Sequence, residues 1–190
     1  VTDGMLWPLG QWWNEEGDIE NGRSNFAQMT NAAYTAVKEI YPDAIVIIHI
    51  DNAYELRDWY FTQFRQNGGK LDMIGLSHYP QMNSKKTWEE MNSSAATNVA
   101  ALYSKFRLPI MICEVGVKSS DLTLAATILK DFRERICTIN GCKGAFYWEP
   151  EVYGGWRPDE YKELGWNSYD MGCFTKKGQM ADALNYLLHE

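Results

Sequence analysis

The chain has 190 residues, of which 45% are hydrophobic and 23% are charged, as in an ordinary globular domain that buries a substantial core. No apolar run approaches the roughly 20 residues of a membrane-spanning helix, and an aromatic content of 14% excludes intrinsic disorder. The formal net charge is −7 and basic residues do not cluster beyond pairs, so a nucleic acid is not expected as a partner.

Strand-like and helix-like segments alternate along the chain. In chain order we expect a helix at residues 24–40, a strand at 44–50, a helix at 55–66, a strand at 71–77, a helix at 87–106, a strand at 109–113, a helix at 121–139, a strand at 143–148 and a short helix at 179–188. Thr87 and Glu90 form a capping box, and Gly68 follows the second helix as a stop signal. The β-branched, apolar strands are typical of strands that are buried on both faces.

Repeated strand–helix units predict a parallel sheet, either doubly wound or closed as a (β/α)₈ barrel. No Gly-rich phosphate loop follows any strand, which disfavours a dinucleotide fold, and we expect no cofactor. Polar side chains end every strand: His49, Asp51, Ser77, His78, Glu114 and Glu149. Parallel strands bring these ends to one rim, where barrel enzymes carry their chemistry, so the barrel is favoured.

Four strands make only half of a barrel, which needs eight strands and about 250 residues. A four-stranded half has two open edges and an uncovered apolar face. We therefore interpret residues 1–190 as the C-terminal half of an α/β barrel, roughly strands five to eight, and expect an N-terminal half-barrel to be needed for a complete fold.

Tryptophan and cysteine give weaker signals. Six of the eight tryptophans fall in two segments, where they either stack on sugar rings or simply pack: Trp7, Trp12, Trp13, Trp148, Trp156 and Trp166. Cys113 lies in an apolar run and is expected to be a buried free thiol. Cys137 and Cys142 flank a turn and could form a disulfide bridge. The spacing of cysteines and histidines fits no metal site.

Two strand-end carboxylates suggest glycoside hydrolysis. A retaining glycosidase needs two carboxyl groups about 5–5.5 Å apart. Glu114 and Glu149 end neighbouring strands, which lie about 4.8 Å apart, so the residues alone allow them as a catalytic pair. A structural ion pair is the alternative role for a lone strand-end glutamate such as Glu114.

Several motifs, and their order along the chain, resemble those of the endo-β-1,4-galactanases of glycoside hydrolase family 53. Five blocks match that family in order: residues 3–10 (Asp-Gly-Met-Leu-Trp-Pro-Leu-Gly), 47–51 (Ile-Ile-His-Ile-Asp), 75–80 (Gly-Leu-Ser-His-Tyr-Pro), 112–114 (Ile-Cys-Glu) and 146–150 (Phe-Tyr-Trp-Glu-Pro). The resemblance implies a retaining (β/α)₈ barrel that cleaves internal β-1,4-galactosidic bonds in the galactan side chains of pectin. It also implies a secreted or cell-surface location, because this polymer does not cross membranes.

The resemblance also implies roles for individual residues. Glu114 is similar to the family's nucleophile, whereas the acid/base glutamate is expected immediately before Val1, outside this chain. Candidates for hydroxyl recognition are Asp51, Ser77, His78, Tyr79 and Glu149, and candidates for stacking on the sugar are Trp7, Trp148 and Trp156. Tyr147 or His78 could keep the nucleophile ionised. For His49, a core position is as plausible as ligand binding.

This chain departs from the family pattern at two places. His78 stands where the family usually has Tyr, and the loop at residues 151–166 differs from well-known members. Some bacterial members bind calcium near this loop, but the spacing of Asp159, Glu160 and Glu163 matches no calcium loop, so no metal is predicted. Two alternatives remain open: another retaining plant-polysaccharide β-glycosidase, and a non-catalytic carbohydrate-binding relic.

Overall fold

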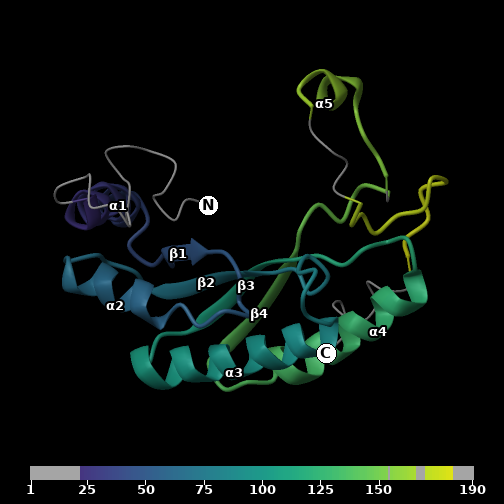
Figure 1. Cartoon of the computed structure of the whole chain (residues 1–190). Coiled ribbons are helices and arrows are strands. Elements are labelled where there is room, and N and C mark those ends of the chain that lie inside the picture. The colour runs from purple at the N-terminus through teal and green to yellow at the C-terminus, as the bar shows by residue number, and fades with distance from the viewer. Residues whose placement is uncertain (1–21, 154, 166–169, 182–190) are drawn as a thin grey trace.

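The computed structural model describes residues 22–153, 155–165 and 170–181. Its four parallel strands form one sheet in the order β1-β2-β3-β4: β1 (Ile47–Ile50), β2 (Met73–His78), β3 (Ile110–Val115) and β4 (Cys142–Tyr147). Its helices are α1 (Gly22–Ile40), α2 (Asp58–Gln66), α3 (Trp88–Phe106), α4 (Leu122–Phe132), the π-helical turn η1 (Arg133–Cys137) and α5 (Asp159–Glu163). A helix connects each strand to its parallel neighbour, so the chain forms part of a (β/α)₈ barrel, as predicted (Figure 1).

Local signals position the helix ends. The capping box before α3 is confirmed, because Thr87 Oγ1 accepts from the Glu90 N–H at 3.3 Å and the Glu90 carboxylate accepts from the Thr87 N–H at 2.7 Å. Helix α2 ends at Gln66, and Gly68 takes a positive φ of 82° two residues later. The predicted stop is therefore confirmed at a position that suits glycine.

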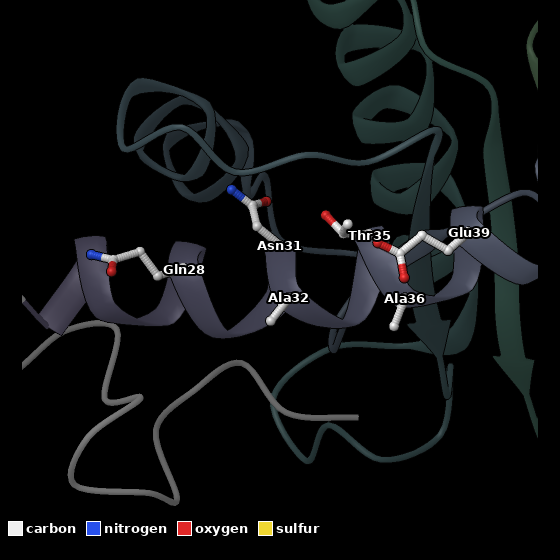
Figure 2. A pocket seen from close by; sticks show the side chains of 6 residues that line it. All are labelled: Gln28, Asn31, Ala32, Thr35, Ala36 and Glu39. Atoms are coloured by element: carbon white, nitrogen blue, oxygen red, sulfur yellow. The ribbon is translucent and has the colours of Figure 1, made fainter.

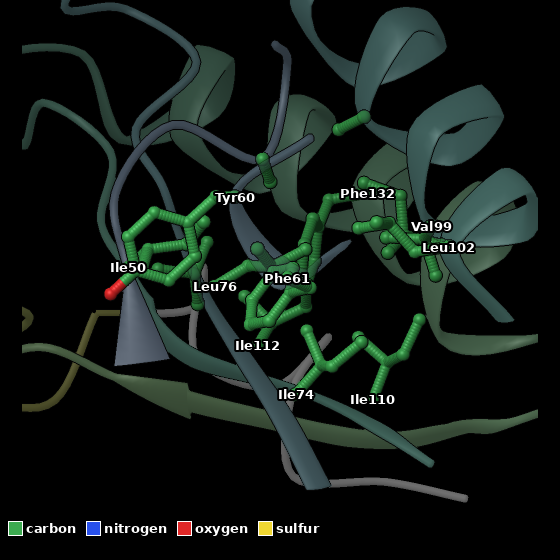
Figure 3. Close-up of a cluster of buried hydrophobic side chains, with 14 of the residues drawn as sticks. Ile50, Tyr60, Phe61, Ile74, Leu76, Val99, Leu102, Ile110, Ile112 and Phe132 are labelled. Atoms are coloured by element: carbon green, nitrogen blue, oxygen red, sulfur yellow. The ribbon is translucent and has the colours of Figure 1, made fainter. Parts of the chain in front are cut away.

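The core lies between the sheet and the helices on one side of it. Figure 3 shows Phe61 of α2, Leu102 of α3 and Phe132 of α4 together with strand residues such as Ile74 and Ile112. All five side chains are at most 1% exposed. Burial of this apolar surface is the main force that holds the helices against the sheet.

The expectation that all four strands are buried on both faces is correct for β2 only. Every residue of β2 is buried, whereas β4 contains no fully buried residue and its Phe146 side chain is 63% exposed. Helices α2, α3 and α4 cover one face of the sheet, and no other described segment forms a matching layer over the opposite face. In a closed barrel, that opposite face is the interior.

The last third of the chain differs from the prediction in three places. The helix expected at residues 121–139 is α4 followed by η1, whose wider turn places Ile136 in the core. Residues 179–181 are not helical, and the rest of the helix expected at 179–188 lies outside the described residues. Helix α5 was not predicted, because its five residues are too few to show an amphipathic period.

The four cysteines are free thiols in this structure, including the pair that could form a bridge. The interaction between the Cys137 and Cys142 thiols raises the pKa of Cys137 and lowers the pKa of Cys142 to about 7. The bridge that the sequence allowed is therefore not formed in this structure.

None of the helices in the described ranges is long and apolar enough to cross a membrane.

Candidate active site

A β-bulge turns Glu114 toward the uncovered face of the sheet. Leu76 of β2 pairs with Ile112 of β3, but the next residue, Ser77, pairs with Glu114, so β3 carries one extra residue at this point. Strict alternation would place Glu114 on the same face as Ile112, which is buried in the core. The bulge places it beside Ser77 instead, and bulges are a common way to re-aim a side chain at an active site.

Two hydroxyl groups hold the same oxygen of the Glu114 carboxylate. Oε2 accepts a hydrogen bond from Ser77 Oγ at 3.0 Å and another from the Tyr79 hydroxyl at 2.7 Å. The Glu114 side chain is only 13% exposed. These two hydrogen bonds fix the position of Oε2 and the orientation of the carboxylate.

His49 completes this group, although the sequence left its role open. Its Nε2 lies 2.8 Å from Ser77 Oγ, and its Nδ1 lies 4.0 Å from Glu114 Oε1. Burial lowers the pKa of His49 below its ordinary value of 6.5, and the charge of Glu114 opposes this effect. The sequence carried no signal for this role, because it depends on the register that sets His49 opposite Gly75. A side-chain carbon at Gly75 would lie 2.7 Å from Cys113 Sγ and 3.0 Å from His49 Cβ, so the glycine allows these residues to pack closely.

His78 lies on the other face of the sheet. Its side chain is 0% exposed, its Nε2 is 2.8 Å from Asn92 Oδ1 on α3, and its ring stacks on Phe132 of α4. Burial lowers its pKa to about 4, so it is neutral at ordinary pH. Strand alternation explains this position, because His78 follows Ser77 directly. His78 is therefore not part of the proposed site.

Tyr147 does not support the carboxylate either. Its hydroxyl accepts from the Val117 N–H at 3.1 Å and lies 2.8 Å from the Met171 carbonyl oxygen. It thus connects the end of β4 to the segment that follows β3 and to the segment around Met171. The side chains that donate to the Glu114 carboxylate are Ser77 and Tyr79, in place of the Tyr147 or His78 expected from the sequence.

The remaining candidates are spread around the rim. Asp51 follows β1 and its half-exposed carboxylate accepts from Asn52 Nδ2 at 2.7 Å. Trp148 directly follows β4 and is 39% exposed. Trp156 contacts Tyr161 of α5, which projects away from the sheet in Figure 1. Trp7 lies outside the described residues.

Glu149 has an unusual backbone but no observed link to Glu114. Its φ is 47°, in the left-handed region that non-glycine residues rarely adopt. Such strain is often kept at functional sites. Among the hydrogen bonds and ion pairs of the described residues, none joins Glu149 to Glu114, so the structure adds nothing to the catalytic pair that spacing alone allows.

Gly116 allows the segment after Glu114 to pass close to Tyr79. A side-chain carbon at this position would lie 2.9 Å from the Tyr79 ring and 2.9 Å from Met171 Sδ. The Tyr79 ring carries the hydroxyl that holds Glu114, so the glycine supports the site indirectly.

A hollow on α1 and a search for metal ligands add no further catalytic group among the described residues. An open hollow on α1 is lined by Gln28, Asn31, Ala32, Thr35, Ala36 and Glu39, and Figure 2 shows these side chains along a single helix. Glu39 is its only ionisable group, and none of the Glu114 group lines it. No cluster of three His, Cys, Asp or Glu side chains suited to a metal ion occurs within residues 22–153, 155–165 and 170–181.

Comparison with known proteins identifies relatives over the whole chain. The sequence model described as glycosyl hydrolase family 53 matches residues 1–187. An arabinogalactan endo-β-1,4-galactanase from Humicola insolens is 23% identical over 97% of this chain and 58% of its own length. A probable arabinogalactan endo-β-1,4-galactanase A from Aspergillus flavus is 31% identical over 79% of this chain and 47% of its own length. The chain thus spans about half the length of these relatives.

Solved structures agree on the fold. One from a study of two fungal β-1,4-galactanases matches with a TM-score of 0.72 and 21% identity, covering 99% of this chain and 59% of the other. A family 53 catalytic domain from Ignisphaera aggregans also has a TM-score of 0.72, with 17% identity, covering 98% of this chain and 55% of the other. At these identities the likeness concerns architecture alone, and it agrees with a partial (β/α)₈ barrel.

Proposed function

Because the chain belongs to glycosyl hydrolase family 53, we propose that the protein cleaves internal β-1,4-galactosidic bonds with retention of configuration, using Glu114 as nucleophile. The observation that carries the proposal is the asymmetric setting of this carboxylate. Oε2 accepts two hydroxyl hydrogen bonds, whereas Oε1 has no hydrogen-bond donor among the described residues. One oxygen is thus anchored and the other is available to react.

The proposed reaction has two steps. In the first, Glu114 Oε1 attacks the anomeric carbon and the bond to the leaving oxygen breaks, while an acid protonates that oxygen. In the second, the same acid, now a base, removes a proton from water, which attacks the anomeric carbon and releases Glu114. We propose that this acid/base is a glutamate that precedes Val1 and belongs to the other half of the barrel.

The same face offers groups for sugar binding. Phe146 and Trp148 lie two residues apart on β4 and its extension, so alternation places both on one face, and both are exposed. Aromatic rings of this kind can stack on the apolar face of a galactose unit. Asp51 at the same rim can accept hydrogen bonds from sugar hydroxyl groups. Trp7, Glu149 and Trp156 stay candidates at more distant positions.

A second half-barrel is part of the proposal. The sheet ends at β1 on one side and β4 on the other, and its uncovered face carries Phe146 at 63% exposure. Four further strands would pair with both edges and cover this face. A polymeric substrate then implies an extracellular or cell-surface location, with pectic galactan as the natural source.

Product analysis tests the choice of sugar. The complete barrel, in which an N-terminal half accompanies this chain, is expected to release galacto-oligosaccharides from β-1,4-galactan and no oligosaccharides from mannan, xylan or β-glucan. Cleavage of one of the other polymers in place of galactan would favour the alternative of another β-glycosidase. Binding of galacto-oligosaccharides in calorimetry, without any cleavage, would favour a carbohydrate-binding relic.

Glu149→Gln is expected to lower activity on galactan and on an activated aryl galactoside to a similar degree. Loss of an acid/base leaves activity on an activated substrate largely intact, because its leaving group needs little protonation. Loss of a carboxylate that binds the sugar lowers activity on both substrates. The measurement is kcat/KM on each substrate at one pH. Selective survival of activity on the aryl galactoside would instead support a Glu114–Glu149 catalytic pair.

Gly116→Ala is expected to lower kcat by about 10- to 100-fold, because displacement of the Tyr79 ring misplaces the nucleophile. Gly69→Ala is the matched control, since its added carbon would overlap the Phe64 ring in the core, away from Glu114. It should lower the thermal unfolding temperature while the folded fraction keeps its kcat. Equal kcat in the Gly116→Ala variant and the parent would refute the role of Gly116.

A further inference from the structure

We propose that His49 is a positioning residue for Glu114 that acts through Ser77 as a neutral imidazole with its proton on Nε2. The inference extends the proposed function, because it concerns how the nucleophile is oriented and which of its oxygens reacts. It depends on the contacts among three side chains from three neighbouring strands: His49 on β1, Ser77 on β2 and Glu114 on β3.

The hydrogen-bond inventory determines the direction of this chain. A serine hydroxyl has a single proton, and an ionised carboxylate can only accept. Since Ser77 Oγ lies 3.0 Å from Glu114 Oε2, its proton is donated there. Ser77 must then accept from the Nε2 of His49 at 2.8 Å, so Nε2 carries a proton. Donation from His49 thereby holds the Ser77 hydroxyl in the rotamer that serves Glu114.

The other ring nitrogen of His49 faces the oxygen that is proposed to react. Nδ1 lies 4.0 Å from Glu114 Oε1, and in the neutral Nε2–H form it carries a lone pair. Protonation of Nδ1 would create a cation beside Oε1, and the resulting ion pair would compete with attack on the sugar. Neutral His49 thus orients the carboxylate, whereas protonated His49 would sequester its reactive oxygen.

The groups around His49 favour the neutral form. Burial of the ring lowers its pKa, and the only described side-chain charge that raises it is Glu114. Ser77 and Tyr79 are neutral hydroxyl groups on the Glu114 carboxylate, and burial raises the pKa of the nearby Cys113 thiol to about 11. When Glu114 loses its charge by forming a glycosyl ester, the pKa of His49 should fall further. His49 is then expected to stay neutral through the reaction.

The first test measures His49 directly and needs no activity. Nitrogen and proton NMR of the histidine rings, recorded against pH, should show the Nε2–H tautomer for His49 in the chain. Glu114→Gln should lower the pKa of His49, while His78, whose pKa of about 4 is due to burial, should not move. A proton on Nδ1 in the neutral form, or an unchanged pKa of His49 in the variant, would overturn the inference.

The second test uses kinetics on galactan of the complete barrel, in which an N-terminal half accompanies this chain. His49→Leu and Ser77→Ala should each lower kcat by about 10- to 100-fold, and the double variant should be no worse than either, because both remove one hydrogen-bonded chain. His49→Gln places an amide donor near the Nε2 position and should recover most of kcat. Its activity should also persist to lower pH, because the group that sequesters Oε1 no longer titrates.

The outcomes separate this inference from the proposed function. Parent-like kcat in His49→Leu, or additive losses in the double variant, would refute the positioning role even if galactan is the substrate. Absence of galactan cleavage together with the predicted tautomer and pKa change would refute the proposed substrate and leave the His49–Ser77–Glu114 arrangement in place. Thermal unfolding of each variant shows whether a loss is due to the fold.

Discussion

In the complete barrel, Glu114→Ala is expected to abolish nearly all galactan cleavage, with a loss in kcat on the order of 10⁴-fold or more. The substitution removes the only atom proposed to bond to the anomeric carbon, the carboxylate that Ser77 Oγ and the Tyr79 hydroxyl hold. The measurement is the rate of reducing-end formation from β-1,4-galactan. The far-ultraviolet circular dichroism of the variant should match that of the parent.

Azide distinguishes a lost nucleophile from a damaged site. A small anion fits the space left by the carboxylate and should restore part of the activity on an activated aryl galactoside, with a galactosyl azide of inverted configuration as product. Glu134→Ala is the matched control, because Glu134 is an exposed carboxylate on η1. Parent-like turnover in Glu114→Ala in the absence of azide would show that the nucleophile lies elsewhere.

Residues 1–190 expressed alone are expected to hydrolyse galactan at less than about 1% of the rate of a complete family barrel. Protonation of the leaving oxygen by a positioned acid is typically worth 10²–10⁴-fold, and we propose that this acid precedes Val1. Binding energy that orients the sugar would be lost as well, since the wall opposite Glu114 would be absent. A Glu114→Ala chain prepared in the same way controls for contaminating hydrolases.

The solution state of the same preparation provides an independent measurement. Open edges at β1 and β4, and the exposed Phe146 and Trp148 side chains, should make the isolated chain self-associate. Light scattering coupled to size exclusion measures its mass, and co-expression with the N-terminal half of a family 53 relative should reduce the association. A stable monomer with the turnover of a complete barrel would contradict both the half-barrel proposal and the placement of the acid.

The order of strands and helices could be predicted from the sequence because each depends on local pattern. The strand signal at residues 44–50 is a short run of apolar, β-branched residues. The helix start at Thr87 is marked by a capping box that involves only Thr87 and Glu90. Alternation of these units then leaves few topologies, and the parallel order β1-β2-β3-β4 is one of them. Which faces are buried was less predictable, because it depends on what covers the sheet.

The position of Glu114 at the end of a strand was also visible in the sequence, but its direction was not. The alternation of side chains between the two faces can be counted along β3 from the sequence alone. The bulge that reverses this count at Glu114 becomes visible only in the pairing of β3 with β2. The same pairing separates Ser77 from its neighbour His78: one lies beside Glu114 and the other packs against Phe132. Ser77 and His78 belong to the same sequence motif, but they lie on opposite faces of the sheet.

The sequence by itself determined a parallel α/β chain with a strand-end glutamate and aromatic residues beside it. Only the tertiary structure decided which groups surround that glutamate. His49, Ser77 and Tyr79 reach it from β1, from β2 and from the residue after β2, so their contacts with Glu114 span 35 residues or more. Such contacts are set by strand register and a bulge, and these arise from packing of the whole sheet against its helices rather than from any local run of residues.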